Sequence, residues 1–258
     1  VETRRINILW SNTEVLKSML FAQLGQPDVR RLFPAAGRAT KVARTAALVM
    51  ERSMVVCANR YDLDCELEDG VEDYLLRGRG QVWVEYSAEI VAGEDGSEKI
   101  GYQSVRLVQV PDSDWTHGPG KRWEQVPWVA RMHLFTTDDF KGQFPDIDLE
   151  QVKIPFNFTL AEGKDRTDEQ GAQDFKRAKV WEIWDKVSMS RIYIADGYEW
   201  ELERTVDPYR LEGFFPCPKP LLSIKRTDCL VPQPEFCQYQ DQAAELDRVN
   251  QRLYTLVE

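Results

Sequence analysis

Histidine supplies the base in most nucleophilic active sites, and this chain of 258 residues contains only two histidines. His117 precedes a Gly-Pro-Gly loop, whereas His133 lies in an alternating segment that is typical of a strand. A Ser or Cys nucleophile needs a base within hydrogen-bond reach. No Gly-x-Ser-x-Gly elbow occurs in the chain. We therefore predict that His117 is exposed, that His133 is packed or solvated, and that neither is catalytic.

Acidic residues are numerous, and two groups of them have the spacing of cation ligands. Asp112 and Asp114 flank a predicted turn, as in a metal-dependent nuclease, but no motif places a third carboxylate beside them. The Asp146–Glu150 segment alternates like the start of a calcium loop, yet Gln151 occupies the position of the turn glycine. Paired carboxylates also serve glycoside hydrolysis. We interpret these residues as surface acids and keep a metal-dependent nuclease or glycosidase as a less favoured alternative.

Phosphate and metal motifs are incomplete. The Gly78-Arg79-Gly80 segment lacks the third glycine of a dinucleotide fingerprint and the Gly-Lys-Ser/Thr of a P-loop. The five cysteines are irregularly spaced and contain no Cys-x-x-Cys pair, so we expect free thiols in a reducing compartment. The sequence therefore predicts no catalytic residue, no metal site and no bound cofactor.

Composition favours a folded, non-membrane protein. The chain is 43% hydrophobic, 29% charged and 11% aromatic, a composition that argues against disorder. No apolar run is long enough to span a bilayer, so we expect no membrane partner. The net charge of −10 and the lack of a sustained basic run argue against tight binding to nucleic acid. DNA that merely passes an acidic surface stays compatible with this charge.

Residues 1–77, which precede the candidate histidines and carboxylates, have the periodicity of helices. An apolar stripe recurs from Ile6 to Leu20, and a second helix is predicted from about Arg38 to Cys57. One face of that second helix is formed by Val42, Ala46, Val49, Ser53 and Val56, with further small residues suited to close packing. A shorter helix is predicted over 64–77.

Antiparallel strands are predicted over about 81–205. The strand-like segments are 81–86, 100–110, 127–135, 180–186, 191–195 and 198–203. Turns are predicted at 93–97 and at Asp196-Gly197, the latter as a tight hairpin. A short helix is expected over 137–144. Residues 145–178 are predicted as an exposed excursion, with a helical turn or two near 168–177.

The last part of the chain is a proline-rich crossing over 206–235 followed by a long amphipathic helix over 236–258. The helix stripe consists of Leu246, Val249, Leu253 and Leu256 at three- and four-residue steps. Exposed stripes of this kind mark interfaces, so these four leucine and valine residues are a possible subunit interface. Folding of the stripe back onto its own domain stays an open alternative. The predicted fold class is α+β, with N-terminal helices packed on antiparallel strands.

The order of six motifs resembles portal proteins of tailed bacteriophages, of the podovirus type. The motifs are Trp10-Ser11-Asn12-Thr13 followed by Leu16 and Leu20, Gly78-Arg79-Gly80 followed by Val82-Trp83-Val84, and the segments 123–130, 180–186, 211–220 and 239–247. The resemblance implies a structural subunit of a homo-oligomeric ring of about twelve copies at one capsid vertex. It implies that DNA is packaged and ejected through an axial channel, and that the portal itself catalyses no reaction.

The resemblance also implies the domains and the partners. Residues 1–235 correspond to the wing and residues 236–258 to the start of a stem helix, while the clip, the second stem helix and the crown are absent from this sequence. Expected partners are capsid and scaffolding proteins, terminase, tail or adaptor proteins and passing viral DNA. The expected location is the virion, after assembly in the bacterial host cytoplasm. A head-to-tail adaptor or neck protein is the alternative within the same class.

Overall fold

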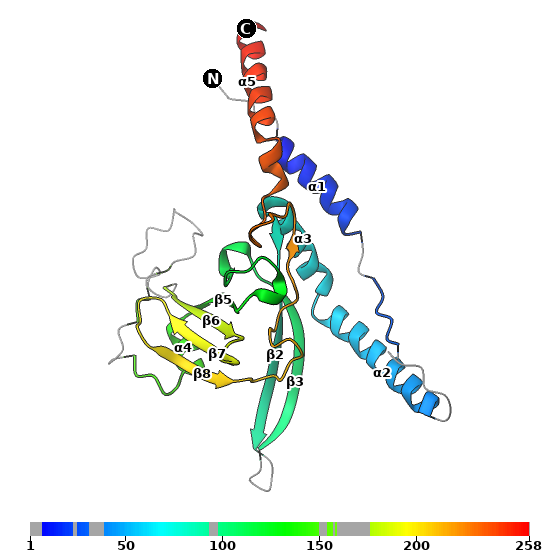
Figure 1. The fold of residues 1–258 in the computed structure, drawn as a ribbon, viewed down its shortest axis with the longest axis vertical. Helices are drawn as coiled ribbons and strands as arrows, with labels where there is room; N and C mark the ends of the chain where they lie inside the picture. The colour runs from blue at the N-terminus through cyan, green and yellow to red at the C-terminus, as the bar shows by residue number, and fades with distance from the viewer. Residues whose placement is uncertain are drawn as a thin grey trace. The chain divides into compact units, whose positions relative to one another are not determined.

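The computed structural model describes residues 7–22, 25–30, 39–92, 98–149, 154–156, 158 and 176–257. It combines helices with antiparallel sheets, and this confirms the predicted α+β class (Figure 1). The chain divides into two compact units. Unit 1 comprises Val1–Val110, Cys217–Arg226 and Val231–Glu258, and unit 2 comprises Pro111–Pro216 and Thr227–Leu230.

Three helices begin unit 1, as the periodicity predicts. They are α1 (Ile8–Leu20), α2 (Ala39–Arg60) and α3 (Leu63–Arg77). The side chain of Asn7 caps α1 by accepting a hydrogen bond from the Trp10 amide at 3.3 Å. Gly78 ends α3 in the left-handed region, with φ of +85°, where glycine has no steric cost.

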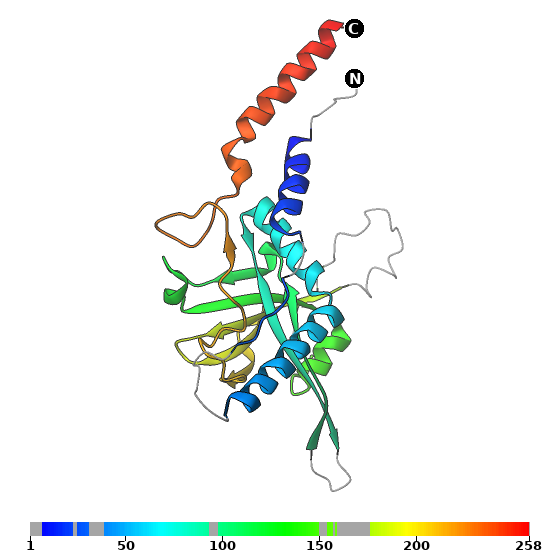
Figure 2. The ribbon, with the colours of Figure 1, turned by 90° about the vertical axis from the view of Figure 1, so that its right-hand side faces the viewer.

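A long hairpin forms the sheet of unit 1. It consists of β2 (Val82–Ala92) and β3 (Glu98–Gln109), which pair antiparallel as a twisted ribbon (Figure 2). A second pair joins β1 (Arg79–Gly80) to β9 (Leu221–Leu222), a contact that the sequence did not predict. A methyl group on Gly80 would lie only 2.0 Å from the carbonyl oxygen of Gly70, so α3 and β1 can approach this closely only at a glycine.

Side-chain hydrogen bonds tie the hairpin to α3 and the returning chain to the hairpin. The Glu66 carboxylate accepts a hydrogen bond from the Gln109 backbone amide, and Asp73 accepts one from the Gln109 side chain at 2.6 Å. Gln81, which is 2% exposed, donates to the Pro218 carbonyl at 3.1 Å. The end of β3 is therefore fixed to α3, and the Pro218 segment is fixed to the start of the hairpin.

Unit 2 contains a five-stranded antiparallel sheet. Its order is β4 (Trp115–His117), β5 (Trp128–Phe135), β6 (Ala178–Asp185), β7 (Ser190–Ala195) and β8 (Glu201–Val206). Strand β6 alternates buried and half-buried residues along its full length. One row across the sheet consists of Trp115, Arg131, Glu182, Tyr193 and Glu203.

The core of unit 2 is aromatic and closed. Helix α4 (Thr137–Gln143) begins at the cap Thr136, as predicted for this segment to within one residue, and buries Phe140 completely. Phe144, Val180 and Tyr193 pack around it. At the other end of the sheet, Phe214 contacts the ring of Trp184, which is fully buried.

Several predicted boundaries are wrong in detail. Strand β2 ends at Ala92 instead of residue 86, and α2 ends at Arg60 instead of Cys57. The last strand of the meander is Glu201–Val206 instead of 198–203, so Asp196-Gly197 does not form a two-residue hairpin. Tyr198 packs against the core, and a register shift between Tyr193 and Ile194 lengthens the connection. The final helix α5 (Gln240–Val257) starts four residues later than predicted, because Glu235–Gln238 forms a 3-10 turn first.

Some predictions fall outside the described residues. They are Ile6, the turn at 93–97 and most of the 145–178 excursion, including residues 168–175 of its helical turn. Where this excursion is described, the prediction that it is exposed is wrong: Ile154 is 7% exposed and belongs to the core of unit 2, and Phe156 packs against that core. Arg177, predicted to end a helical turn, forms an antiparallel bridge with Phe158 instead.

Candidate assembly surface

The α5 stripe is exposed to solvent wherever it is described. Leu246 is 43% exposed, Val249 is 51% exposed and Leu253 is 53% exposed. The side of α5 that includes Ala243, Asp247 and Asn250 is half-buried instead. The Leu256 side chain lies outside the described residues. Leu246, Val249 and Leu253 therefore do not fold back onto their own unit.

Helix α1 also leaves apolar side chains uncovered. Trp10 is 62% exposed, Met19 is 75% exposed and Leu20 is 57% exposed. Helix α1 also contacts α3, where the Lys17 ammonium lies 2.7 Å from Glu72 and 3.1 Å from Glu68. The hydrogen bond that Lys17 donates to Glu72 raises the pKa of Lys17, and the second bond to Glu68 adds to the effect. A polar contact thus anchors α1 while Trp10, Met19 and Leu20 stay exposed.

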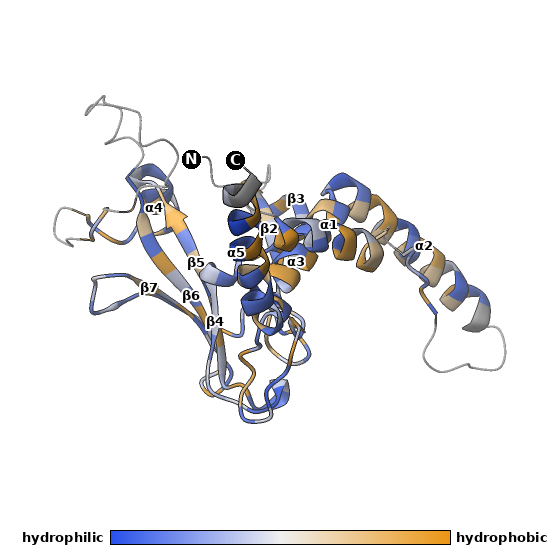
Figure 3. Ribbon diagram, turned by 90° about the horizontal axis from the view of Figure 1, so that it is seen from above, coloured by the Kyte–Doolittle hydropathy of each residue, from blue (hydrophilic) through white to orange (hydrophobic). Residues whose placement is uncertain are grey.

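Helix α2 exposes the very face that its sequence marks as apolar. Val42 is 77% exposed, and Val49 and Val56 are each 60% exposed. The half-buried residues of α2 are Ala43, Ala47, Glu51 and Ala58, which form a narrow seam on the other side. The small residues of α2 are therefore divided between its two sides. Ala43 and Ala47 are half-buried, whereas Ala46 lies in the exposed groove with Val42, Thr45 and Val49. Figure 3 shows hydrophobic residues recurring along α1 and α2.

Three helices of unit 1 therefore carry apolar residues that nothing in the described part of the chain covers. Monomeric proteins seldom leave such residues in continuous stripes, and stripes of this kind usually mark a protein interface. Sequence reasoning identified the α5 stripe but not the exposure of α1 and α2. The sequence of α2 does indicate a surface for packing against another helix. Its apolar face alternates four- and three-residue steps, at Val42, Ala46, Val49, Ser53 and Val56.

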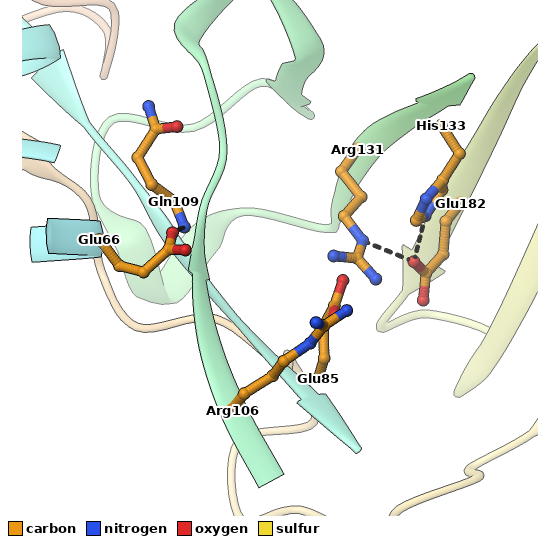
Figure 4. Close-up of polar contacts among 7 residues, drawn as sticks. All are labelled: Glu66, Glu85, Arg106, Gln109, Arg131, His133 and Glu182. Atoms are coloured by element: carbon orange, nitrogen blue, oxygen red, sulfur yellow. Dashed lines mark hydrogen bonds and ion pairs between the residues drawn. The ribbon is translucent and has the colours of Figure 1, made fainter. Parts of the chain in front are cut away.

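Unit 2 contains a buried polar cluster centred on Glu182 (Figure 4). Its carboxylate accepts hydrogen bonds from Arg131 Nε at 2.7 Å, from Trp184 Nε1 at 2.9 Å and from His133 Nε2 at 2.8 Å. Burial raises the pKa of Glu182, but the hydrogen bond from His133 and the charge of Arg131 outweigh it and lower the pKa to about 2. A carboxylate that stays ionised and is saturated with donors is poorly suited to proton transfer near neutral pH.

This cluster also accounts for His133. The ring lies in β5 and is half-buried, in keeping with the packed alternative that the sequence left open. Its neighbours are Glu182, Phe135 and Tyr193. Burial raises the pKa of the Tyr193 hydroxyl, and the negative charge of Glu182 adds to this effect. The arrangement is that of a satisfied internal network, which the sequence did not reveal because its members come from three strands.

The remaining candidates occupy two segments of unit 2. Asp112 and Asp114 directly precede β4, which carries His117, whereas Asp146 and Asp148 are exposed beyond α4. Asp112 and Asp114 belong to a 3-10 turn, and the side chain of Ser113 donates to Asp114 at 2.9 Å. The prediction that His117 is exposed is wrong: it is half-buried in β4, because its ring packs against Trp115 and its Nδ1 lies 2.7 Å from the Gly118 carbonyl. Among the described residues, no group of three or more His, Cys, Asp or Glu side chains is arranged to hold a metal ion.

No described helix is both long and apolar enough to cross a membrane. Comparison with known proteins identifies no relative: no family model matches the chain, and no curated protein matches it. The candidate site is therefore defined by geometry alone, as the uncovered apolar faces of α1, α2 and α5.

Proposed function

We propose that this chain is a structural subunit of a bacteriophage portal ring, through which viral DNA is packaged and ejected. The observation that carries the proposal is the exposure of Leu246, Val249 and Leu253 on α5. A stripe of this kind requires a partner, and a ring of identical subunits supplies one to every copy. The order of the six sequence motifs is the reason for preferring a portal to other ring-forming proteins.

Charge supports the same proposal. The chain has 43 acidic and 33 basic residues, so a ring built from it has a net negative charge, and we propose that the surface facing DNA shares that sign. Repulsion between this surface and the phosphate backbone would let DNA slide past without binding. We further propose that the ring performs no catalysis and that terminase, capsid, scaffolding and tail or adaptor proteins dock on it.

Electron microscopy of the protein expressed from its native gene tests this proposal. We expect closed rings with an axial opening and a mass of about twelve subunits. Double substitution of Val249→Asp and Leu253→Asp should prevent ring formation while leaving the circular dichroism of the subunit unchanged. Double substitution of Gln251→Asp and Thr255→Asp adds the same charge to α5 outside the stripe and should leave rings intact. Stable monomers of the unsubstituted protein, or rings without any opening, would contradict the proposal.

A further inference from the structure

The outward face of α2 has the features of a helix-packing surface. Its valines at positions 42, 49 and 56 are spaced by seven residues, and the small residues Ala46 and Ser53 lie between them. This four-three alternation lets a second helix lie along α2 at a shallow angle, with its larger side chains over the small ones. The face contains no Trp, Tyr or Phe, which are the usual anchors of a helix that lies in a membrane interface.

The charges on α2 define which partner fits. The helix carries four basic residues, namely Lys41, Arg44, Arg52 and Arg60, and one acidic residue, Glu51, which is on the half-buried side. The side chains of Lys41 and Arg52 flank the valine stripe and form no ion pair with any described residue. Two α2 helices facing each other would bring like charges together, and this is unfavourable. The partner surface must therefore be apolar and acidic.

The chain itself carries a surface of that kind on α1 and α3. Helix α3 contains six acidic residues and one basic residue. Asp64 and Asp69 are exposed, and the side chains of Glu68 and Glu72 stay 47% and 42% exposed although both contact Lys17. Helix α1 adds the exposed apolar side chains of Leu16 and Leu20, which are four residues apart and share one face of the helix beside Lys17.

We propose that α2 of one subunit docks on the α1–α3 helix pair of the next subunit. This inference rests on the proposed ring and specifies which two surfaces meet. The two surfaces differ, so the contact is head-to-tail, and a head-to-tail contact closes into a ring when its rotation allows it. The valine stripe covers the apolar side of the neighbour's α1, while Lys41 and Arg52 face the acids of its α3.

Reciprocal charge reversal tests the inference with mass photometry of the native-length protein. Lys41→Glu with Arg52→Glu, and separately Asp64→Lys with Asp69→Lys, should each raise the protein concentration needed for assembly by roughly tenfold. Combining all four substitutions should restore assembly to within about threefold of the unsubstituted protein. Lys219→Glu with Lys225→Glu makes the same charge change at exposed positions outside the helices and should have no effect.

The outcomes separate this inference from the proposed function. Rings that form normally in both reversed variants would overturn the α2 contact and leave the portal proposal standing. Failure of the unsubstituted protein to assemble would overturn both. A basic apolar helix could also bind a membrane surface, and flotation with vesicles of phosphatidylserine and phosphatidylcholine tests this alternative. Flotation that depends on Lys41 and Arg52, together with unchanged assembly of the reversed variants, would assign α2 to a membrane surface and overturn the inference.

Discussion

Unit 2 and the helices of unit 1 use apolar residues in opposite ways. In unit 2, Phe140 and Trp184 are fully buried, and even the charged Glu182 is satisfied inside the sheet. In unit 1, Trp10, Met19 and Val42 are each more than half exposed, and polar contacts such as Lys17 with Glu72 hold the helices in place. The sheet of unit 2 therefore buries large aromatic residues in a core of its own, whereas the helices of unit 1 leave large apolar residues uncovered.

Removal of one large aromatic side chain from each region gives the strongest test of this difference. Phe140→Ala should lower the free energy of unfolding by about 3–5 kcal/mol, because it leaves a cavity among Phe135, Phe144 and Tyr193. Trp10→Ala should change it by no more than about 0.5 kcal/mol in the unassembled subunit. Chemical denaturation measures both values, and a large loss with Trp10→Ala would show that α1 is covered within its own subunit.

The buried network of unit 2 should make stability depend on acid. The pKa of Glu182 is about 2 in the folded state against an ordinary value of 4.5, so its contribution to stability is complete above pH 4.5. That contribution, up to about 3 kcal/mol, is lost as the pH falls from about 4.5 towards 2. Glu182→Gln should remove most of this slope and destabilise the protein by about 3 kcal/mol at neutral pH.

Glu201→Gln is the matched control for this carboxylate. Glu201 is exposed on β8 and pairs with Arg204, so its loss should cost no more than about 1 kcal/mol and should leave most of the acid slope in place. An identical acid response in the Glu182 and Glu201 variants would show that the internal network does not govern stability.

Disturbing the close contact between α3 and β1 should lower the stability of unit 1 by a smaller amount. Gly80→Ala should destabilise unit 1 by roughly 1–3 kcal/mol, because the added methyl group meets the Gly70 carbonyl. Gly142→Ala places a methyl group in open space on α4 and should stabilise the protein by about 0.5–1 kcal/mol. Thermal unfolding distinguishes the two, and a neutral Gly80→Ala would mean that the helix and the strand do not meet at this point.

Periodicity explains why so much of the architecture could be predicted. Helices α2 and α3 and strands β5 and β6 are repetitive enough for their type and approximate bounds to follow from the sequence. Pairings between distant segments could not be predicted, and the β1–β9 contact is an example. Each of those two strands has only two residues, so no local pattern marks them.

Local sequence patterns also could not determine which side chains are buried. An apolar stripe looks the same whether it covers a core or faces another molecule, so the exposure of Val49 could not be separated from burial by sequence alone. The Glu182 network was missed for a related reason, because a carboxylate in an alternating strand is ordinarily expected on the solvent side.

Sedimentation velocity of the chain over a concentration series tests the central claim most directly. We expect self-association that grows with concentration and is lost in the combined Val49→Asp and Val249→Asp variant, with the fold unchanged by circular dichroism. A single monomeric species at every soluble concentration for both proteins would contradict the claim that the uncovered faces of α2 and α5 join copies of this chain.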